Sequence, residues 1–206
     1  MEDQTLGPDQ FASANRIHIV GAPGTGKSTL ARRLGATLGL PVHELDAIAY
    51  EGPDFHEQPL VQREAAAREI ASDPRWVAEG IFIGWTDPLL ERADLIIWLD
   101  YLTWRGSAAR AVARTFRGAL REMRFRRGSE RFLRVADYGR NAVSLIQVLH
   151  MTREYWGPKD DKRRYPVTRE STAEELKIHA AKVLHVTCAD DARDLLELFK
   201  RPTRER

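Results

Sequence analysis

The stretch from Gly21 to Ser28 reads GAPGTGKS, a full match to the phosphate-binding pattern G-x-x-x-x-G-K-[ST]. Glycines let the backbone turn so that successive N–H groups face one anion, and the dipole of the following helix adds to that field. Lys27 is then expected to reach the β- and γ-phosphates, and Ser28 to offer its hydroxyl to Mg²⁺. We therefore expect ATP, or another NTP, to bind here with Mg²⁺. The expected contacts are Gly21, Ala22, Pro23, Gly24, Thr25, Gly26, Lys27, Ser28 and Thr29.

The residues on either side of this loop have the pattern that the motif requires. Residues 16–20 form a short β-branched run, which is typical of a buried strand. After the loop, Leu30, Leu34 and Leu38 fall on one face of an expected helix. Strand, glycine loop and helix together distinguish a phosphate loop from an ordinary glycine-rich turn.

Three carboxylates come at the ends of expected strands. Asp46 follows the strand at 42–45, Glu79 follows Trp76–Ala78, and Asp100 follows the apolar run Leu95–Leu99. Ligands bind at the carboxyl ends of strands in open α/β sheets, so we expect the three side chains to surround the phosphate loop. Asp100 could then hold a Mg²⁺-bound water, while Asp46 or Glu79 orients a substrate hydroxyl.

Each carboxylate also has a structural interpretation. Asp100 could cap the next helix, Asp46 could occupy a turn or a helix N-cap, and Glu79 could be a solvated strand end. The sequence leaves these alternatives open for each residue taken singly. Three carboxylates at strand ends around one phosphate loop favour a functional role over three unrelated structural roles.

An arginine-rich stretch follows the fourth expected strand. Between Thr103 and Arg140 there are eleven Arg, no Lys and three acidic residues. Arg110, Arg114 and Arg117 share one helical face, from which planar guanidinium groups could clamp phosphate oxygens. A solvated basic face is the plain alternative, and nucleic-acid binding is another, with Phe residues for stacking.

Strand and helix patterns alternate along most of the chain, which predicts an α/β fold with a parallel sheet covered on both faces. The alternation stops at residues 104–160, where long helical patterns indicate an inserted lid. We expect a flexible leader at 1–14, one domain at 15–200 and a tail at 201–206. The strands are expected at 16–20, 42–45, 76–78, 95–99 and 183–187, with helices at 29–38, 60–71 and near 195–199.

Length, composition and net charge limit the classes of protein to which the chain can belong. A chain of 206 residues with 43% hydrophobic residues can bury one substantial core, and its net charge is only +2. Cys188 is the only cysteine, which excludes an intrachain disulfide, and we expect it to be a small buried residue. No apolar run approaches membrane-spanning length, and the N-terminus has no apolar signal core. These features predict a cytoplasmic protein with no membrane partner.

With these residues in view, the chain resembles the phosphate-loop small-molecule and nucleotide kinases. It looks most like the adenylate-kinase-related proteins often labelled topology modulation proteins. The likeness covers residues 17–117, and its strings are Leu45-Asp46-Ala47 with Tyr50, then Pro59, then RWVAEG at 75–80 and RADLIIWLD at 92–100. The resemblance implies a five-stranded parallel sheet of order 2-3-1-4-5, an arginine-bearing lid and phosphoryl transfer from ATP.

Two departures from the family pattern bear on the substrate. True adenylate kinases carry a Thr-Gly pair and then an Arg after the second strand, whereas this chain has Leu45-Asp46. An aspartate at that point resembles shikimate- and gluconate-type kinases, in which a carboxylate meets an acceptor hydroxyl. Related kinases often have Asp where this chain has Glu79.

The sequence therefore predicts an ATP- and Mg²⁺-dependent phosphotransferase that acts on a small hydroxyl- or phosphate-bearing molecule, nucleotides included. The expected catalytic residues are Lys27, Asp46, Glu79, Arg110 and Arg114, and the expected metal residues are Ser28 and Asp100. The alternative is a nucleotide-binding regulatory ATPase whose arginine-rich helices contact nucleic acid or a protein partner.

Overall fold

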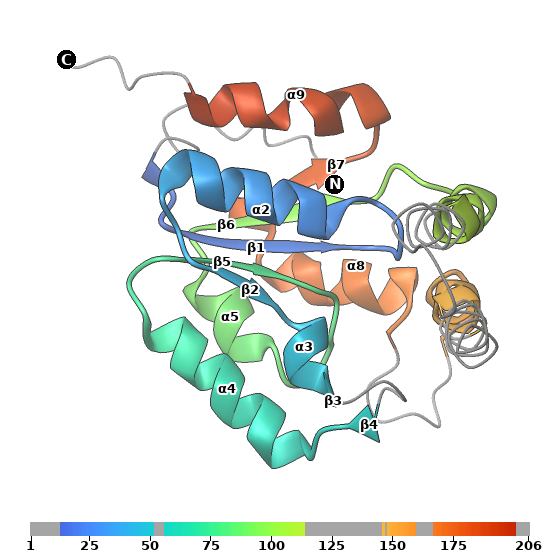
Figure 1. The fold of residues 1–206 in the computed structure, drawn as a ribbon, viewed down its shortest axis with the longest axis horizontal. Helices are drawn as coiled ribbons and strands as arrows, with labels where there is room; N and C mark the ends of the chain where they lie inside the picture. The colour runs from blue at the N-terminus through green and yellow to red at the C-terminus, as the bar shows by residue number, and fades with distance from the viewer. Residues whose placement is uncertain (1–12, 52–55, 114–145, 147, 160–166, 201–206) are drawn as a thin grey trace, which may run out of the picture.

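A five-stranded parallel sheet with β1 at its centre forms the middle of the protein (Figure 1). The computed structural model describes residues 13–51, 56–113, 146, 148–159 and 167–200. The strands of the sheet are β1 (Arg16–Gly21), β2 (Val42–Glu44), β5 (Trp76–Glu79), β6 (Leu95–Leu99) and β7 (Val183–Val186). They lie in the order β2-β5-β1-β6-β7, and all neighbours are parallel. Counted along the chain, these strands have the order 2-3-1-4-5, which confirms the prediction.

The three central strands are apolar because both faces of the sheet are covered. All residues of β5 and β6 are buried, and in β1 only Arg16 is partly exposed. The structure extends β1 by one residue to Gly21 and β5 by one to Glu79. It ends β2 and β7 one residue before the expected ends.

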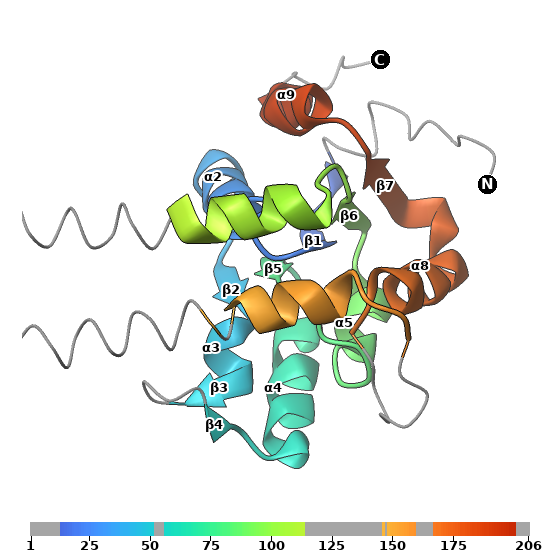
Figure 2. The same cartoon turned by 90° about the vertical axis from the view of Figure 1, so that its right-hand side faces the viewer.

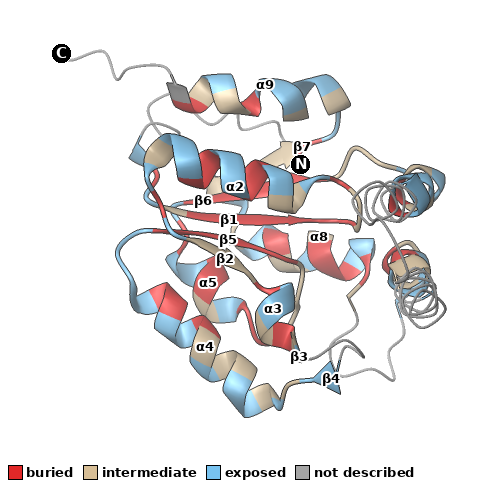
Figure 3. Ribbon diagram, viewed as in Figure 1, coloured by how far each residue is buried: buried red, intermediate tan, exposed pale blue. Residues whose placement is uncertain are grey.

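Helices cover both faces of the sheet, as Figures 1 and 3 show. Helices α2 and α9 pack on one face, where Leu34 and Leu195 are buried against Ile17 and Ile97. Helices α4, α5 and α8 pack on the other face. The bounds are α2 (Lys27–Leu38), α3 (Asp46–Ala49), α4 (Leu60–Ser72), α5 (Asp87–Arg92), α8 (Arg169–Ile178) and α9 (Ala189–Lys200). The fold is therefore a three-layer α/β arrangement, with the strand order and the glycine loop of phosphate-loop NTPases.

Several short elements were not expected from the sequence. They are helix α3, the hairpin of β3 (Tyr50–Glu51) and β4 (His56–Glu57), helix α5, helix α8 and the 3₁₀ turn η2 (Ala180–Lys182). Helix α8 has a local signal that could have been found. Oγ1 of Thr168 accepts a hydrogen bond from the N–H of Ser171, and Oγ of Ser171 accepts one from the N–H of Thr168, which is a capping box.

Two helical segments, at residues 104–113 and 148–155, lie side by side at the edge of the sheet that carries the glycine loop (Figures 1 and 2). They occupy the beginning and the end of the expected lid. Residues 114–145, with Arg114 and Arg117, lie outside the described residues, as do 1–12 and 201–206. Ala14, placed in the expected leader, is buried in the core instead. Among the described residues, no helix has the length and apolar character needed to cross a membrane.

Gly21→Ala should destabilise the protein, because Gly21 has a φ of 147° and an added Cβ would collide with the carbonyl oxygen of Leu99. We expect a loss of about 2–3 kcal/mol in the free energy of unfolding, measured by urea titration. Gly39→Ala is the matched control, since Gly39 also has a positive φ (63°) but no atom within 4 Å of an added Cβ. It should cost about 1 kcal/mol. Equal losses in the two variants would contradict close packing at Gly21.

Candidate functional site

The phosphate loop leaves β1 at Gly21 and enters α2 at Lys27. Gly24 and Gly26 have positive φ values of 81° and 95°, which suit glycine. Inside the loop, Thr25 donates from Oγ1 to the carbonyl of Ala22 at 2.8 Å, and Lys27 Nζ donates to the same carbonyl at 3.2 Å. Gly26, the residue before α2, makes no side-chain cap at the start of this helix. The N–H groups at a helix N-terminus attract anions such as a phosphate.

Two side chains from beyond β6 hold this loop. The hydroxyl of Tyr101 donates to the carbonyl of Thr25. Arg110 donates from Nη1 to the Tyr101 hydroxyl at 3.1 Å and to the Gly24 carbonyl at 3.4 Å, and its guanidinium lies 5.4 Å from the centre of the Tyr101 ring. The structure thus brings Arg110 to the loop. Tyr101 was not singled out from the sequence, because nothing marks an isolated tyrosine after a strand.

Glu79 lies beside the loop at the end of β5, with only 2% of its surface exposed. Burial raises the pKa of Glu79 above its usual value, although Lys27 and a hydrogen bond with Ser28 act in the opposite direction. The neighbouring carboxylates of Asp46 and Glu44 raise the pKa further. Glu79 and Ser28 therefore supply adjacent oxygen atoms, the ligand type that Mg²⁺ prefers. The solvated alternative for Glu79 is wrong, because the side chain is buried.

Asp46 is exposed at the first residue of α3. The N–H of Leu45 donates to the carbonyl of Glu79 at 2.9 Å, which ties the start of α3 to the end of β5. Asp46 is close enough to Glu79 and to Tyr50 to raise the pKa of both. The structure therefore places Asp46 near both Glu79 and Tyr50.

Asp100 interacts with two basic side chains, whereas the sequence suggested that it holds a Mg²⁺-bound water. Arg169 donates to both of its oxygens, at 2.8 and 2.7 Å, and Nε2 of His185 lies 3.0 Å from Oδ2. Burial alone would raise the pKa of Asp100, but the hydrogen bonds with His185 and Arg169 outweigh burial and lower it. In the part of the chain that the structure describes, the Asp100 side chain bonds to Arg169 and His185 and does not cap a helix. A role as metal ligand, which stays a prediction, would require these basic groups to move.

Aromatic rings surround the Asp100 ion pair. Trp98 stacks on His185 with ring centres 4.1 Å apart, and the Arg169 guanidinium lies 6.0 Å from the centre of Trp98 and 5.8 Å from that of Trp156. The indole N–H of Trp98 faces the hydroxyl of Tyr155 at 3.5 Å. This cluster joins the helical segment 148–155 to β6, β7 and α8. It was missed because its members come from four separate parts of the sequence.

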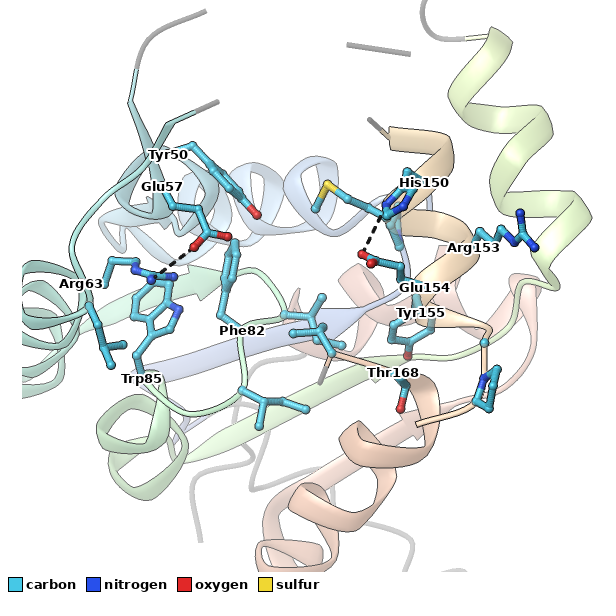
Figure 4. A pocket seen from close by; sticks show the side chains of 18 residues that line it. Tyr50, Glu57, Arg63, Phe82, Trp85, His150, Arg153, Glu154, Tyr155 and Thr168 are labelled. Atoms are coloured by element: carbon cyan, nitrogen blue, oxygen red, sulfur yellow. Dashed lines mark hydrogen bonds and ion pairs between the residues drawn. The ribbon is translucent and has the colours of Figure 1, made fainter. Parts of the chain in front are cut away.

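A pocket of about 740 Å³ adjoins the loop, and Pro23 lies in its wall (Figure 4). One wall comes from Tyr50, the β4–α4 region, and Phe82 and Trp85 between β5 and α5. The other wall comes from the segment 148–158 with Val167 and Thr168. The volume lies in the range of roughly 300–1,000 Å³ that is typical of small-molecule sites.

The structure also bears on the expected burial of Cys188 and on metal binding. Cys188 is exposed, so the expectation of a buried cysteine is wrong. Over the described ranges, no three His, Cys, Asp or Glu side chains converge as a metal-binding group would.

No protein-family model matches the chain. The uncharacterized protein YqaC of Bacillus subtilis (strain 168) is 33% identical over 86 residues, which are 40% of this chain and 47% of that protein. The chain thus matches about half the length of this curated relative.

Solved structures also resemble the chain. A shikimate kinase from Acinetobacter baumannii, in complex with shikimate, is 17% identical, with 85% of this chain and 99% of that one covered and a TM-score of 0.39. A gluconokinase from Sinorhizobium meliloti 1021 is 16% identical, with 90% and 91% covered and a TM-score of 0.44. An uncharacterized protein from Eubacterium ventriosum ATCC 27560 is 12% identical, with 89% and 96% covered and a TM-score of 0.40. These likenesses carry no reaction over to this chain.

Arg169→Met should destabilise the protein, because it leaves the carboxylate of Asp100, whose side chain is only 1% exposed, without its bidentate partner. Arg169 is itself 49% exposed, so we expect a loss of about 1–2 kcal/mol, measured by urea titration at neutral pH. Arg193→Met is the control, since the Arg193–Asp190 pair is 78% and 79% exposed and should contribute less than about 0.5 kcal/mol. Equal effects would mean that the Asp100 pair is no stronger than a surface pair.

Proposed function

We propose that the chain is an ATP- and Mg²⁺-dependent phosphotransferase that phosphorylates a small molecule bound in the pocket beside its phosphate loop. The observation that carries the proposal is the position of Glu79. This buried carboxylate ends β5 next to β1, where Lys27 and Ser28 of the loop favour its charged form and the nearby carboxylate of Asp46 disfavours it. We assign Lys27 and Ser28 to the nucleotide and Asp46 to the acceptor, because in-line transfer requires the two sets of groups to lie next to one another.

The nucleotide would be held by the loop amides, the uncapped start of α2 and the amine of Lys27. Mg²⁺ would neutralise charge on the β- and γ-phosphate oxygens, with Ser28 and Glu79 as the nearest oxygen donors. Arg110 is already in contact with the loop carbonyl of Gly24. Its planar donors are suited to binding the oxygens of a phosphoryl group held by the loop.

Asp46 is the residue that we assign to the acceptor. It is exposed and lies near Tyr50 in the pocket wall, whereas Glu79 is buried against the loop. The acceptor hydroxyl oxygen would bond to the γ-phosphorus as the bond from that phosphorus to the β–γ bridging oxygen breaks. ADP leaves with the bridging oxygen, and Asp46 accepts the hydroxyl proton.

The regulatory ATPase is the second candidate. It rests on the arginine-rich stretch as a surface for nucleic acid or protein, and most of that stretch lies outside the described residues. Arg110 belongs to the described part and contacts the phosphate loop. That contact favours a role for Arg110 in nucleotide chemistry.

Lys27→Ala should lower ATP turnover by about 100-fold or more and weaken ATP binding, because it removes a charged donor aimed at the phosphates. The fold should be retained, since Lys27 is only partly buried and its amine donates to the carbonyl of Ala22 within the same loop. Turnover is measured as ADP release and folding by circular dichroism. Lys177→Ala, an exposed position on α8, should leave turnover unchanged. Wild-type turnover in a folded Lys27→Ala protein would overturn the site assignment.

Asp46→Asn should reduce transfer to an acceptor by about 100-fold while ATP affinity changes less than about twofold, because its partner is the acceptor hydroxyl. ATP affinity is measured by calorimetry and transfer by detection of the phosphorylated product. Asp73→Asn, at an exposed helix end, serves as the control and should behave as wild type. Parallel losses of ATP affinity and transfer would instead make Asp46 a nucleotide contact or a structural residue.

A further inference from the structure

We propose that Tyr101 is a positioning residue for the phosphate loop. Its hydroxyl, held by Arg110, fixes the peptide between Thr25 and Gly26 so that the Gly26 N–H is aimed at a phosphate before the nucleotide arrives. This role rests on the proposed function to the extent that nucleotide phosphates bind in the loop. It adds to the nucleotide site a residue that lies outside the loop motif and takes no part in the chemical step.

The backbone on the N-terminal side of Tyr101 is held by both neighbouring strands. Leu99, the last residue of β6, pairs with Gly21 at the start of the loop. The N–H of Asp100 donates to the carbonyl of Val186 in β7 at 2.9 Å. The ring of Tyr101 packs against the hydrophobic core on the α2 side of the sheet. Register and packing therefore set the place of the Tyr101 hydroxyl.

The hydroxyl of Tyr101 has one proton, and its neighbours decide where that proton goes. Arg110 donates to the hydroxyl from Nη1 at 3.1 Å, and a guanidinium can only donate. The hydroxyl must therefore accept from Arg110, and its own proton goes to the carbonyl of Thr25. A charged donor polarises the hydroxyl and strengthens the hydrogen bond that the hydroxyl gives to the loop.

Peptide geometry converts this hydrogen bond into a direction for an N–H group. The C=O and N–H of a trans peptide point to opposite sides, and the described residues contain no cis peptide. A Thr25 carbonyl fixed toward Tyr101 therefore turns the Gly26 N–H away from Tyr101. Glycine restricts its own backbone least, so a bond from outside is needed to select one orientation at Gly26, where φ is 95°. The Gly26 N–H is one of the expected phosphate donors where the loop enters α2.

The hydrogen bonds within the loop hold a different part of it. The carbonyl of Ala22 accepts from the N–H of Thr25 at 3.3 Å, from Thr25 Oγ1 at 2.8 Å and from Lys27 Nζ at 3.2 Å. These bonds close the first turn of the loop. The carbonyls of Gly24 and Thr25 instead accept from side chains that come from beyond β6. The second half of the loop therefore depends on those side chains for its orientation.

Close packing brings Arg110 to this position. A Cβ added to Gly24 would lie 3.2 Å from the carbonyl oxygen of Ser107 and 3.4 Å from the Cβ of Arg110. Ser107 is fully buried and Ala111 is 2% exposed, so one face of the helical segment 104–113 is buried. The guanidinium of Arg110 thus reaches Tyr101 and the loop from a packed backbone.

Tyr101→Phe tests this role because it removes the hydroxyl and keeps the ring in the core. We expect binding of ATP and of inorganic triphosphate, each with Mg²⁺, to weaken by the same factor of about three to ten, as for one lost hydrogen bond. Calorimetry measures both affinities. Thr172→Val is the control, since it removes a buried hydroxyl that donates to the carbonyl of Thr168 on α8. It should leave both affinities unchanged.

A spectroscopic measurement separates positioning from a general loss of stability. In isotope-labelled protein without nucleotide, Tyr101→Phe should shift the amide NMR signal of Gly26, because the peptide that Tyr101 holds is released. The amide signal of Gly39, at the other end of α2, should keep its position. Shifts of equal size at Gly26 and Gly39 would overturn the positioning role, because the effect would then not be local to the loop.

The outcomes also separate this role from the proposed function. Weaker triphosphate binding by Tyr101→Phe, with no phosphate transfer by the wild type to any acceptor, would support the positioning role and contradict the phosphotransferase. Transfer by the wild type, with wild-type triphosphate affinity in Tyr101→Phe, would support the phosphotransferase and overturn the positioning role. A loss of affinity for ATP but not for triphosphate would overturn it too. A wild-type protein that binds neither ATP nor triphosphate would overturn both.

Discussion

The contact between Gly21 and Leu99 is the constraint on which the site depends. The two residues are partners in the register of β1 and β6, and Gly21 approaches the Leu99 backbone so closely that no side chain fits between them. The phosphate loop therefore starts directly beside the end of β6. On the other side of β1, Ile19 pairs with Glu79 of β5. The parallel register thus delivers the loop and the buried carboxylate to the same edge of the sheet.

Opposing electrostatic effects meet at Glu79. Burial disfavours its charged form, and the nearby Asp46 and Glu44 act in the same direction, whereas Lys27 and Ser28 favour the charge. A divalent cation beside Ser28 would tip this balance toward the carboxylate. A buried carboxylate with two acidic neighbours lowers the stability of a protein that has no ligand bound. Such carboxylates are typical of sites where a ligand neutralises the charge. Asp100 shows the contrasting case, in which Arg169 and His185 already provide the compensation.

The sheet could be predicted because its signals are local. The apolar runs of β1, β5 and β6 and the glycines of the loop specify strands and a turn by themselves, and the strand order followed from the resemblance to phosphate-loop kinases. The roles of single side chains could not be predicted in this way. Asp100 ends an apolar strand just as Glu79 does, yet its partner Arg169 is 69 residues further along the chain. Only the packing of α8 against the sheet decides between an ion pair and a free carboxylate.

The residues that line the pocket were even harder to predict from the sequence, because only the tertiary structure brings them together. Tyr50, Phe82 and Tyr155 belong to three separate segments, and nothing in the sequence indicates that they line one pocket. Short elements such as α3 and the β3–β4 hairpin orient these side chains, and such elements have too few residues for a clear periodic pattern. The sequence therefore predicted the glycine loop and the strands beside it, and it left the residues that line the pocket unpredicted.

Phosphorus NMR of the purified protein with ATP, Mg²⁺ and a panel of hydroxyl compounds tests the central claim most directly, because it follows the γ-phosphoryl group itself. We expect a new phosphoester signal that grows as the γ-phosphate signal of ATP declines, and that requires both Mg²⁺ and an acceptor. Release of inorganic phosphate alone, at a rate that no acceptor changes, would contradict it and would leave the chain a nucleotide-hydrolysing protein.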